Sequence, residues 1–210
     1  FKEAILPLAD TVSDRASLIG AANTITFRED GAVHADNTDG IGFLESIRAA
    51  VPGWDPCAGP SLVLGAGGAA RAIVSALLSA GVPEIRIANR TRQKADMLVD
   101  HFGARIAAVE WTALGDAVDG AALIVNTTAL GMVGKPPLHV PFEGAAPGAL
   151  AVDIVYNPLE TVFLAQAKAA GLRPVDGLGM LLYQAVPGFE SWFGRRPEVD
   201  EALRLAVLPR

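Results

Sequence analysis

Near the middle of the chain, an apolar strand is followed by a glycine-rich turn and a helix, and this order restricts the possible folds strongly. Residues 61–64 read Ser-Leu-Val-Leu, the turn spans Gly65 to Ala70, and an apolar helical segment continues to Ala80. In the spacing Gly-x-Gly-x-x-Ala, the first glycine permits a tight turn, the second lets a pyrophosphate approach the backbone, and the third position must be small. Exposed N–H groups and the helix dipole then favour an anion. This order predicts a Rossmann-type dinucleotide site, and a glycine-rich loop in a non-binding sheet is the alternative.

Strands and helices alternate regularly after this turn. The expected elements are strands at 84–88, 107–111, 121–125 and 150–155, and helices at 91–102 and 161–170. Such alternation is typical of a parallel sheet that helices cover on both faces. We therefore expect an α/β fold with a Rossmann-type doubly wound parallel sheet.

The segments outside this pattern predict a second, smaller unit. Ser13 is expected to cap a short helix, and the Asp30-Gly31 turn is expected to join two strands in a hairpin. The other expected elements are a helix at 2–9, strands at 23–27 and 32–36, a helix at 39–50, a Pro/Gly-rich loop at 52–60, and helices at 178–193 and 198–206. The last two helices can belong to the smaller unit, because a chain can cross back to an earlier domain.

Composition narrows the class of partner. The chain has 210 residues and one cysteine, Cys57. Its net charge is −6, and this acidic balance argues against nucleic acid as a binding partner. A lone cysteine provides neither an internal disulfide nor a structural zinc site. No apolar run approaches the roughly 20 residues of a membrane span, and the N-terminus does not read as a signal peptide. We expect a cytoplasmic protein with a small-molecule partner. The missing initiator Met leads us to expect a fragment.

The residues after the second expected strand of the sheet indicate which dinucleotide binds. That strand ends at Ala88, and Asn-Arg-Thr-Arg-Gln-Lys follows at 89–94. NAD sites usually place Asp or Glu here to bind the ribose 2′-OH. The acid is absent, and Arg90, Arg92 and Lys94 occupy its neighbourhood, where a guanidinium can bind a 2′-phosphate with two hydrogen bonds. The residues favour NADP, and a solvated cationic helix start is the alternative.

A carbonyl reduction also needs a proton donor. A Tyr-x-x-x-Lys pattern is missing at Tyr156 and Tyr183. The chain's three histidines are each isolated from the motifs and are expected on the surface: His34, His101 and His139. Lys2 and Asp39 remain as candidates for the proton-transfer groups. From the residues alone, Asp39 is equally a helix N-cap, and Lys2 reads as a surface lysine.

Further motifs run from the first residue to the last helices. They are Phe1-Lys2, Ile19–Thr24, Asn37–Gly40 with Ile41-Gly42, Gly65–Ala70, Asn89–Thr91, Asn126–Thr128 with Gly131-Met132, Asp153–Pro158, and Asp176–Leu181 with Gln184. In content and order they resemble the motifs of the shikimate dehydrogenase family. The resemblance implies an NADP-dependent oxidoreductase of a CH–OH group that reduces 3-dehydroshikimate to shikimate. This reaction belongs to the shikimate pathway, which leads to chorismate and the aromatic amino acids.

The resemblance also implies roles for individual residues. Lys2 and Asp39 would be the catalytic acid/base pair, with Lys2 protonating the developing alkoxide and Asp39 orienting Lys2. The implied substrate-binding residues are Lys2, Asn23, Asp39, Tyr156 and Gln184. The implied cofactor-binding residues are Gly65, Ala66, Gly67, Gly68, Ala69, Asn89, Arg90, Thr91, Lys94, Thr127, Val155, Gly177 and Met180. No metal is implied.

The resemblance implies two domains. Residues 1–38 and 181–210 would form a discontinuous substrate domain without its N-terminal part, and residues 39–180 would form the NADP-binding domain. The family's Ser-x-Ser and its Thr before the Lys are absent, and Ala129 replaces a frequent Ser or Pro. We therefore expect the chain to bind NADP but to be weakly active or inactive. Open alternatives are a dehydrogenase of quinate or of an amino analogue, a non-catalytic NADP-binding module, and a fragment without function. A homodimer is the candidate assembly.

Overall fold

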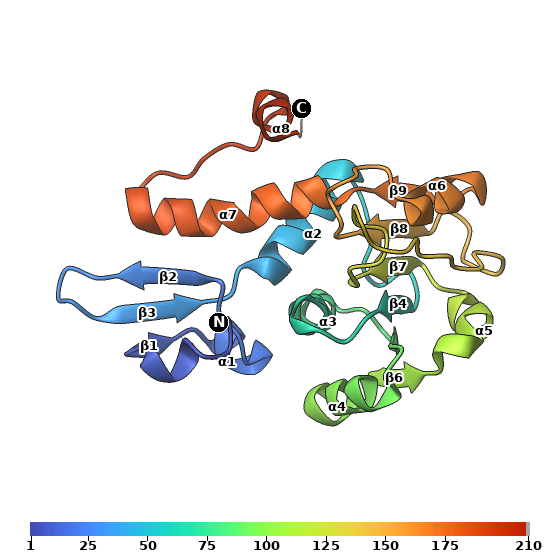
Figure 1. Cartoon of the computed structure of the whole chain (residues 1–210), viewed down its shortest axis with the longest axis horizontal. Coiled ribbons are helices and arrows are strands. Elements are labelled where there is room, and N and C mark those ends of the chain that lie inside the picture. Colours follow the sequence, from blue (N-terminus) through green and yellow to red (C-terminus); the bar gives the residue numbers. More distant parts are fainter. Residues whose placement is uncertain (209–210) are drawn as a thin grey trace.

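In the computed structural model, which describes residues 1–208, the chain forms two sheets with helices between and around them (Figure 1). The larger sheet has six parallel strands in the order β6-β5-β4-β7-β8-β9. These strands are β4 (Ser61–Leu64), β5 (Ile85–Ala88), β6 (Ile106–Val109), β7 (Leu123–Asn126), β8 (Leu150–Asp153) and β9 (Arg173–Val175). Within this sheet the chain enters at the central strand β4, continues through β5 to the edge strand β6, and then passes from β7 through β8 to the opposite edge strand β9. This order confirms the predicted doubly wound sheet.

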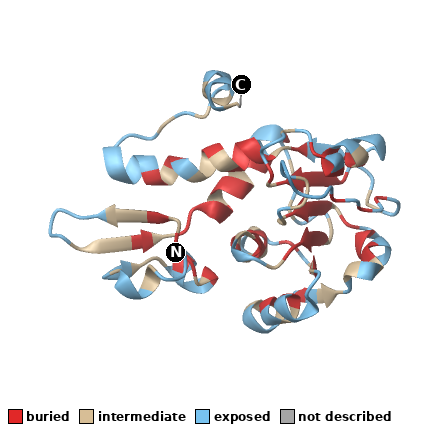
Figure 2. Ribbon diagram, viewed as in Figure 1, coloured by how far each residue is buried: buried red, intermediate tan, exposed pale blue. Residues whose placement is uncertain are grey.

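Helices cover both faces of the larger sheet. They are α3 (Gly68–Ala80), α4 (Arg92–Phe102), α5 (Leu114–Val118), preceded by η2 (Trp111–Ala113), and α6 (Val162–Ala169). Successive residues of β4 point to opposite faces, as the two-residue period of a strand requires. Val63 packs in one core cluster with α3 and α4, whereas Leu62 and Leu64 pack in the other with α5 and α6. The buried strands in Figure 2 reflect this double cover.

The smaller sheet has three strands and a small core. Its order is β1-β3-β2, with β1 (Thr11–Val12) parallel and β2 (Thr24–Phe27) antiparallel to β3 (Val33–Asp36). The helical elements beside it are η1 (Leu6–Leu8) and α1 (Asp14–Ile19). The Ser13 hydroxyl accepts from the N–H of Ala16 at the start of α1, which confirms the predicted N-cap. The fully buried residues of this core are alanines, so it supplies little apolar area.

Helix α2 (Asp39–Ala50) lies between the two sheets, and α7 (Gly177–Phe193) packs closely against it and extends over β2 (Figure 1). A Cβ on Gly42 would lie 2.5 Å from the backbone nitrogen of Gln184, so only glycine allows this approach. The far end of α7 reaches β2, where the indole N–H of Trp192 donates to the Ile25 carbonyl at 2.8 Å. Helix α8 (Glu201–Val207) follows α7. Across residues 1–208, every helix falls short of the length and apolarity that a bilayer crossing requires.

Several local expectations were wrong. Residues 2–9 form turns and the short η1 around Pro7 instead of a continuous helix. The strand expected at 107–111 ends at Val109, because η2 begins at Trp111. Strands β1 and β9 and helix α5 were not expected. They are too short for a periodic signal, and β9 contains Pro174, which an edge strand tolerates.

Candidate active site

Lys2 and Asp39 form an ion pair at the first residue of α2. The Lys2 ammonium donates to Asp39 Oδ2 at 2.7 Å, and the two residues are 37 positions apart in the chain. The Asp39 side chain is 4% exposed and that of Lys2 is 53% exposed, so solvent reaches the ammonium. Thr38, not Asp39, is the N-cap residue of α2. The helix-cap alternative for Asp39 is therefore wrong. Its carboxylate instead accepts hydrogen bonds from Lys2 and Asn23.

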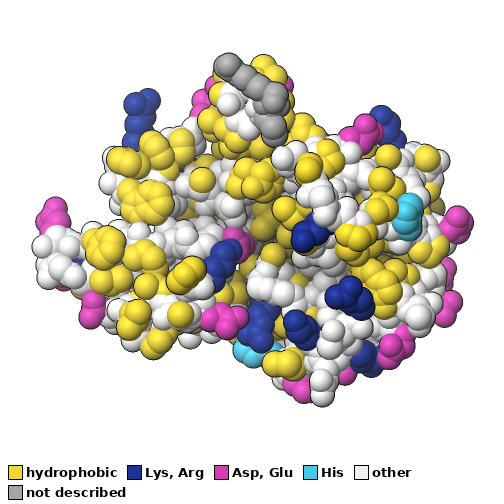
Figure 3. All heavy atoms as spheres, in the orientation of Figure 1, with side chains coloured by type: hydrophobic (Ala, Val, Ile, Leu, Met, Phe, Trp, Pro, Cys, Tyr) yellow, Lys and Arg dark blue, Asp and Glu magenta, His cyan; other side chains and the backbone are white. Residues whose placement is uncertain are grey.

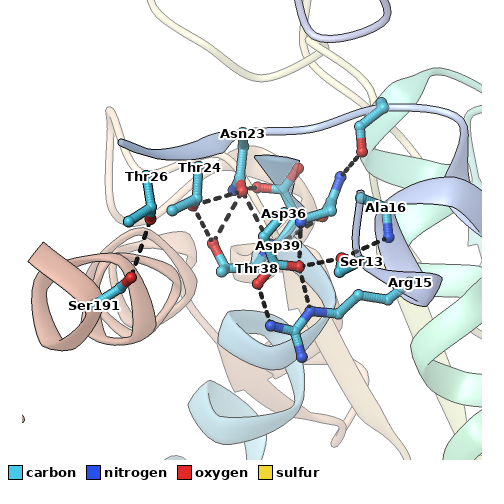
Figure 4. Close-up of polar contacts among 12 residues, drawn as sticks. Ser13, Arg15, Ala16, Asn23, Thr24, Thr26, Asp36, Thr38, Asp39 and Ser191 are labelled. Carbon is cyan, nitrogen blue, oxygen red and sulfur yellow. Dashed lines mark hydrogen bonds and ion pairs between the residues drawn. The ribbon is translucent and has the colours of Figure 1, made fainter. Parts of the chain in front are cut away.

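The second oxygen of Asp39 is held by Asn23 (Figure 4). Asn23 Nδ2 donates to Asp39 Oδ1 at 2.7 Å. Asn23 Oδ1 accepts from the Thr38 backbone N–H at 2.9 Å, the Thr38 hydroxyl at 3.1 Å and the Thr24 hydroxyl at 3.0 Å. These three donors orient the amide so that its NH₂ group faces Asp39. One N–H of Asn23 remains for another acceptor. No motif or spacing in the sequence indicated that Thr24 and Thr38 orient this amide.

A cavity of about 170 Å³ brings the ion pair next to residues of the larger sheet's half. It is lined by Lys2, Asp39, Ala69, Ile154, Tyr156, Gly177, Met180, Leu181 and Gln184. This lining includes most of the residues to which the resemblance assigns substrate binding, and several of those to which it assigns cofactor binding. Asn23 lines an adjoining cavity that shares Lys2. None of the histidines lines either cavity, and His101 and His139 are exposed.

The glycine turn lies at the carboxyl end of β4 and has an open side. Gly65 has φ +113°, and a Cβ there would lie 2.5 Å from Thr127 Oγ1, so only glycine fits. A Cβ on Gly67 or Gly68 would meet nothing within 4 Å. Gly67 is the N-cap of α3 and provides no side-chain capping bond. The start of α3 is thus exposed and has no side-chain cap, which leaves room for a bound pyrophosphate.

The cations after β5 differ in their partners. Arg92 pairs with Asp96 at 2.8 Å and with Glu110 at 2.5 Å. Within residues 1–208, Arg90 and Lys94 are exposed and form no ion pair, and Asn89 Nδ2 donates to the Thr91 carbonyl at 2.8 Å. Lys and Arg side chains are spread over the larger sheet's half in Figure 3. Arg90 and Lys94 are therefore the cations available to an added anion, whereas Arg92 is already neutralised.

A second cavity borders the first on the side of β7 and β8. Thr127, Val155 and Tyr156 are among its lining residues, and Tyr156 and Ile154 line both cavities. The Thr127 hydroxyl donates to the Leu64 carbonyl at 2.7 Å, which joins this wall to β4. Residues 89–94 line neither cavity. The residues assigned to cofactor thus extend from these cavities past the glycine turn to the surface after β5.

One buried carboxyl beside this wall, that of Asp153, begins the Asp153–Pro158 motif, but no role was predicted for it from the sequence. Asp153 is fully buried and accepts from Asn126 Nδ2 at 2.9 Å, Val155 N at 2.9 Å and Thr161 Oγ1 at 2.6 Å. Burial raises the pKa of Asp153 to about 6, and its hydrogen bonds offset only part of this effect. The available signal was its place in the Asp153–Pro158 motif, inside the strand expected at 150–155.

The chain is similar to proteins of one family. Residues 59–133 match the family model described as Shikimate / quinate 5-dehydrogenase, and residues 177–206 match that of the Shikimate 5′-dehydrogenase C-terminal domain. A curated relative, shikimate dehydrogenase (NADP(+)) of Paracoccus denitrificans, is 59% identical over 207 residues, which cover 99% of this chain and 73% of the relative.

Solved structures show the same likeness. Shikimate 5-dehydrogenase from Thermus thermophilus, in complex with NADP(H) and shikimate, is 42% identical with a TM-score of 0.80, covering 94% of this chain and 71% of that one. Quinate dehydrogenase from Corynebacterium glutamicum, in complex with NAD, is 30% identical with a TM-score of 0.88, covering 97% and 73%.

The fold and the cavities define a Rossmann-type dinucleotide-binding protein with a paired ammonium and carboxylate beside the glycine turn. With the relatives above, the chain belongs to the shikimate dehydrogenase family. The resemblance inferred from the motifs is confirmed.

Proposed function

We propose that this chain is an NADP-dependent oxidoreductase that interconverts 3-dehydroshikimate and shikimate at the cavity containing Lys2 and Asp39. The observation that carries the proposal is the ion pair in a cavity that it shares with Ala69 of the glycine turn and Gly177 and Met180 of α7. The names of the 59% identical relative and of the Thermus thermophilus structure support the substrate and the cofactor.

The open glycine turn fits a dinucleotide. Gly65, Ala66, Gly67, Gly68 and Ala69 would hold the pyrophosphate through backbone N–H groups and the α3 dipole. Arg90 and Lys94, with Asn89 and Thr91, would hold the 2′-phosphate. Thr127, Val155, Gly177 and Met180 would border the nicotinamide. When bound, NADPH supplies the hydride.

Lys2 would then provide the proton. In the reducing direction its ammonium donates a proton to the carbonyl oxygen as that oxygen becomes an alkoxide, and the resulting amine takes a proton back from solvent. The exposure of Lys2 allows this return. Asp39, itself held by Asn23, orients the ammonium. Asn23, Tyr156 and Gln184 would donate to or accept from substrate hydroxyl groups.

The domain division also belongs to this proposal. Residues 1–38 and 181–210 would form the substrate domain and 39–180 the cofactor domain, and the two sheets and the cavity between α2, α7 and the glycine turn support this division. Residues 209 and 210 lie outside the described part of the chain. A homodimer and a cytoplasmic location remain predictions, which light scattering and cell fractionation would test.

The test measures binding and turnover separately. Calorimetry is expected to show binding of NADP⁺ in preference to NAD⁺, and NADPH absorbance is expected to report oxidation of shikimate. Lys2→Met should lower kcat by about 10²–10⁴-fold, because it removes the proton donor. Lys168→Met, at an exposed lysine on α6, is the matched control and should leave kcat unchanged. Absence of NADP⁺ binding, or equal rates for the two variants, would contradict the proposal.

Quinate is the second candidate substrate, because a quinate dehydrogenase shares the fold at a TM-score of 0.88. The same assay with quinate distinguishes the two. A kcat/KM for quinate above that for shikimate would replace the first assignment by the second.

A further inference from the structure

The three buried residues Asn126, Asp153 and Thr161 form a polar group that we name the strand-end cluster. Asn126 ends β7, Asp153 ends β8, and Thr161 is the N-cap of α6. They are 0%, 0% and 1% exposed. Asp153 Oδ1 accepts from Asn126, and Asp153 Oδ2 accepts from the Thr161 hydroxyl. One carboxyl group therefore joins two strand ends and a helix start.

The cluster also holds the two loops that leave these strands. In the loop after β8, the N–H of Val155 donates to Asp153 Oδ1 at 2.9 Å. In the loop after β7, Asn126 Oδ1 accepts from Thr128 N at 3.0 Å and from the Thr128 hydroxyl at 2.7 Å, while Asn126 Nδ2 donates to the Leu130 carbonyl at 3.1 Å. Both loops thus take their conformation from the same pair of side chains.

These loops form the wall shared by the two cavities. Ile154 and Tyr156 line the cavity of Lys2 and Asp39, and Thr127 and Val155 line its neighbour. On the proposed function, the reacting carbonyl would lie beside Lys2, the nicotinamide would lie at this wall, and the pyrophosphate would lie at the glycine turn. The cluster would then be next to the nicotinamide end of the cofactor. It lies on the opposite side of β4 from β5, the strand that Arg90 follows.

Stability alone does not account for a carboxyl at this position. Within residues 1–208, Asp153 contacts no cation, and its hydrogen-bond donors are all neutral. Burying a carboxyl without a cation is costly, and well-packed apolar residues often stabilise a core at least as well as buried charge. What the carboxyl provides is acceptor oxygens for donors on three separate segments, which an apolar residue cannot provide.

We propose that the strand-end cluster is a positioning unit that holds the loops after β7 and β8 in place against the nicotinamide end of the cofactor. The proposal rests on the NADP-dependent function above. Asp153, Asn126 and Thr161 do not touch the cofactor. They act through Thr127, Val155 and Tyr156, whose placement depends on a rigid support.

The test compares a ligand with a nicotinamide and one without it. NADPH reaches the wall, whereas adenosine 2′,5′-bisphosphate occupies only the adenosine end. Asp153→Ala leaves three buried donors without an acceptor and can prevent folding, so Thr161→Val is the main variant. It removes the hydroxyl that donates to Asp153 and accepts from the Leu164 N–H, and Thr161→Ser restores both hydrogen bonds. Kd values for both ligands are measured by calorimetry at one pH.

Thr161→Val is expected to weaken NADPH binding about tenfold and to change the Kd of adenosine 2′,5′-bisphosphate by less than about twofold, because only one end of the site loses its support. Thr161→Ser is expected to bind both ligands as the unchanged chain does. Equal weakening for both ligands, or no change for either, would overturn the proposal. If the unchanged chain binds neither ligand, the NADP-dependent function itself fails, and this inference fails with it.

Discussion

Asp36 and Asp153 each end a strand, one in each sheet, and their surroundings differ in charge. Asp36 accepts from the Ser13 hydroxyl at 2.5 Å and from Arg15 Nε at 2.7 Å, and its second oxygen also contacts the Arg15 guanidinium. Among residues 1–208, the donors to Asp153 are all neutral. The smaller sheet pairs its strand-end carboxylate with a cation at the surface, whereas the larger sheet buries a carboxyl without one.

The two carboxyls consequently shift in opposite directions. Burial raises the pKa of Asp36, but hydrogen bonds from Arg15 and Ser13 and the guanidinium charge outweigh it, so its pKa lies below the ordinary value. Burial raises the pKa of Asp153 to about 6, and neutral donors do not outweigh it. At Asp153 the three neutral donors do not offset the loss of solvent around the carboxyl, whereas at Asp36 the adjacent guanidinium and the hydrogen bonds together do.

The largest expected effect comes from removing the uncompensated carboxyl. Asp153→Ala leaves three buried donors without an acceptor, and each costs about 1–3 kcal/mol, so the free energy of unfolding should fall by more than about 3 kcal/mol. Asp153→Asn has the same shape and keeps an acceptor oxygen, so it should cost much less. Urea unfolding at pH 7 measures both. Equal losses in the two variants would show that keeping the shape and one acceptor oxygen does not preserve stability, which would contradict this account.

The second effect is a pH dependence of stability. The pKa of Asp153 is about 6 when folded and has an ordinary value of 3.8, so between about pH 4 and pH 6 the folded chain holds more protons than the unfolded chain. The contribution of Asp153 to stability is full below this window and is lost as pH rises through it, by up to roughly 3 kcal/mol. The difference in unfolding free energy between the unchanged chain and Asp153→Asn, measured from pH 4 to pH 7, isolates this term. A flat or rising difference would contradict the uncompensated burial of Asp153.

The third effect tests the cation of the smaller sheet. Arg15→Met removes the guanidinium that lowers the pKa of Asp36, so the pKa should rise and stability at pH 7 should fall by about 1 kcal/mol. Because the pKa is lowered, the contribution of Asp36 is present above its ordinary value of 3.8 and is lost as pH falls through the folded pKa. Thermal unfolding at pH 7 and pH 3 measures it. Arg48→Met, which breaks the exposed pair with Glu45, is the control and should cost a few tenths of a kcal/mol.

The smallest effect is the response to salt. At about 1 M NaCl the Debye length is about 3 Å, so the loss caused by Arg15→Met should shrink by less than about 1 kcal/mol. The loss caused by Asp153→Ala should stay constant, because no ion pair is screened there. A salt-dependent loss at Asp153 would reveal a charged partner and remove the contrast between the two carboxyls.

The sequence predicted those elements of the larger sheet's half whose signals lie within the element itself or next to it in the chain. The glycine turn at 65–70 and helices α3 and α4 were expected within one or two residues, because glycine spacing, helical period and Gly81 are local signals. Strand β1 was not predicted, because two residues are too few to show the alternating pattern of a strand. Its existence depends on β3, with which it pairs.

The candidate site was less accessible from the residues themselves. The resemblance assigned Lys2 and Asp39 to one site, but the residues alone described a surface lysine and a helix cap. The sequence also grouped Arg92 with Arg90 and Lys94, whereas Arg92 pairs with Glu110, 18 positions away. No pattern within the chain indicates that two charged residues so far apart are neighbours.

The doubly wound sheet, the open glycine turn and the absence of an acid after β5 could be predicted without a structure, because they depend on residues that are close together in the chain. The partners of the polar groups became visible only in the folded chain: Asp39 with Lys2 and Asn23, Arg92 with Glu110, and Asp153 with Thr161. Such side chains can pair only after packing has brought distant segments within hydrogen-bond distance, and burial then sets the pKa that results.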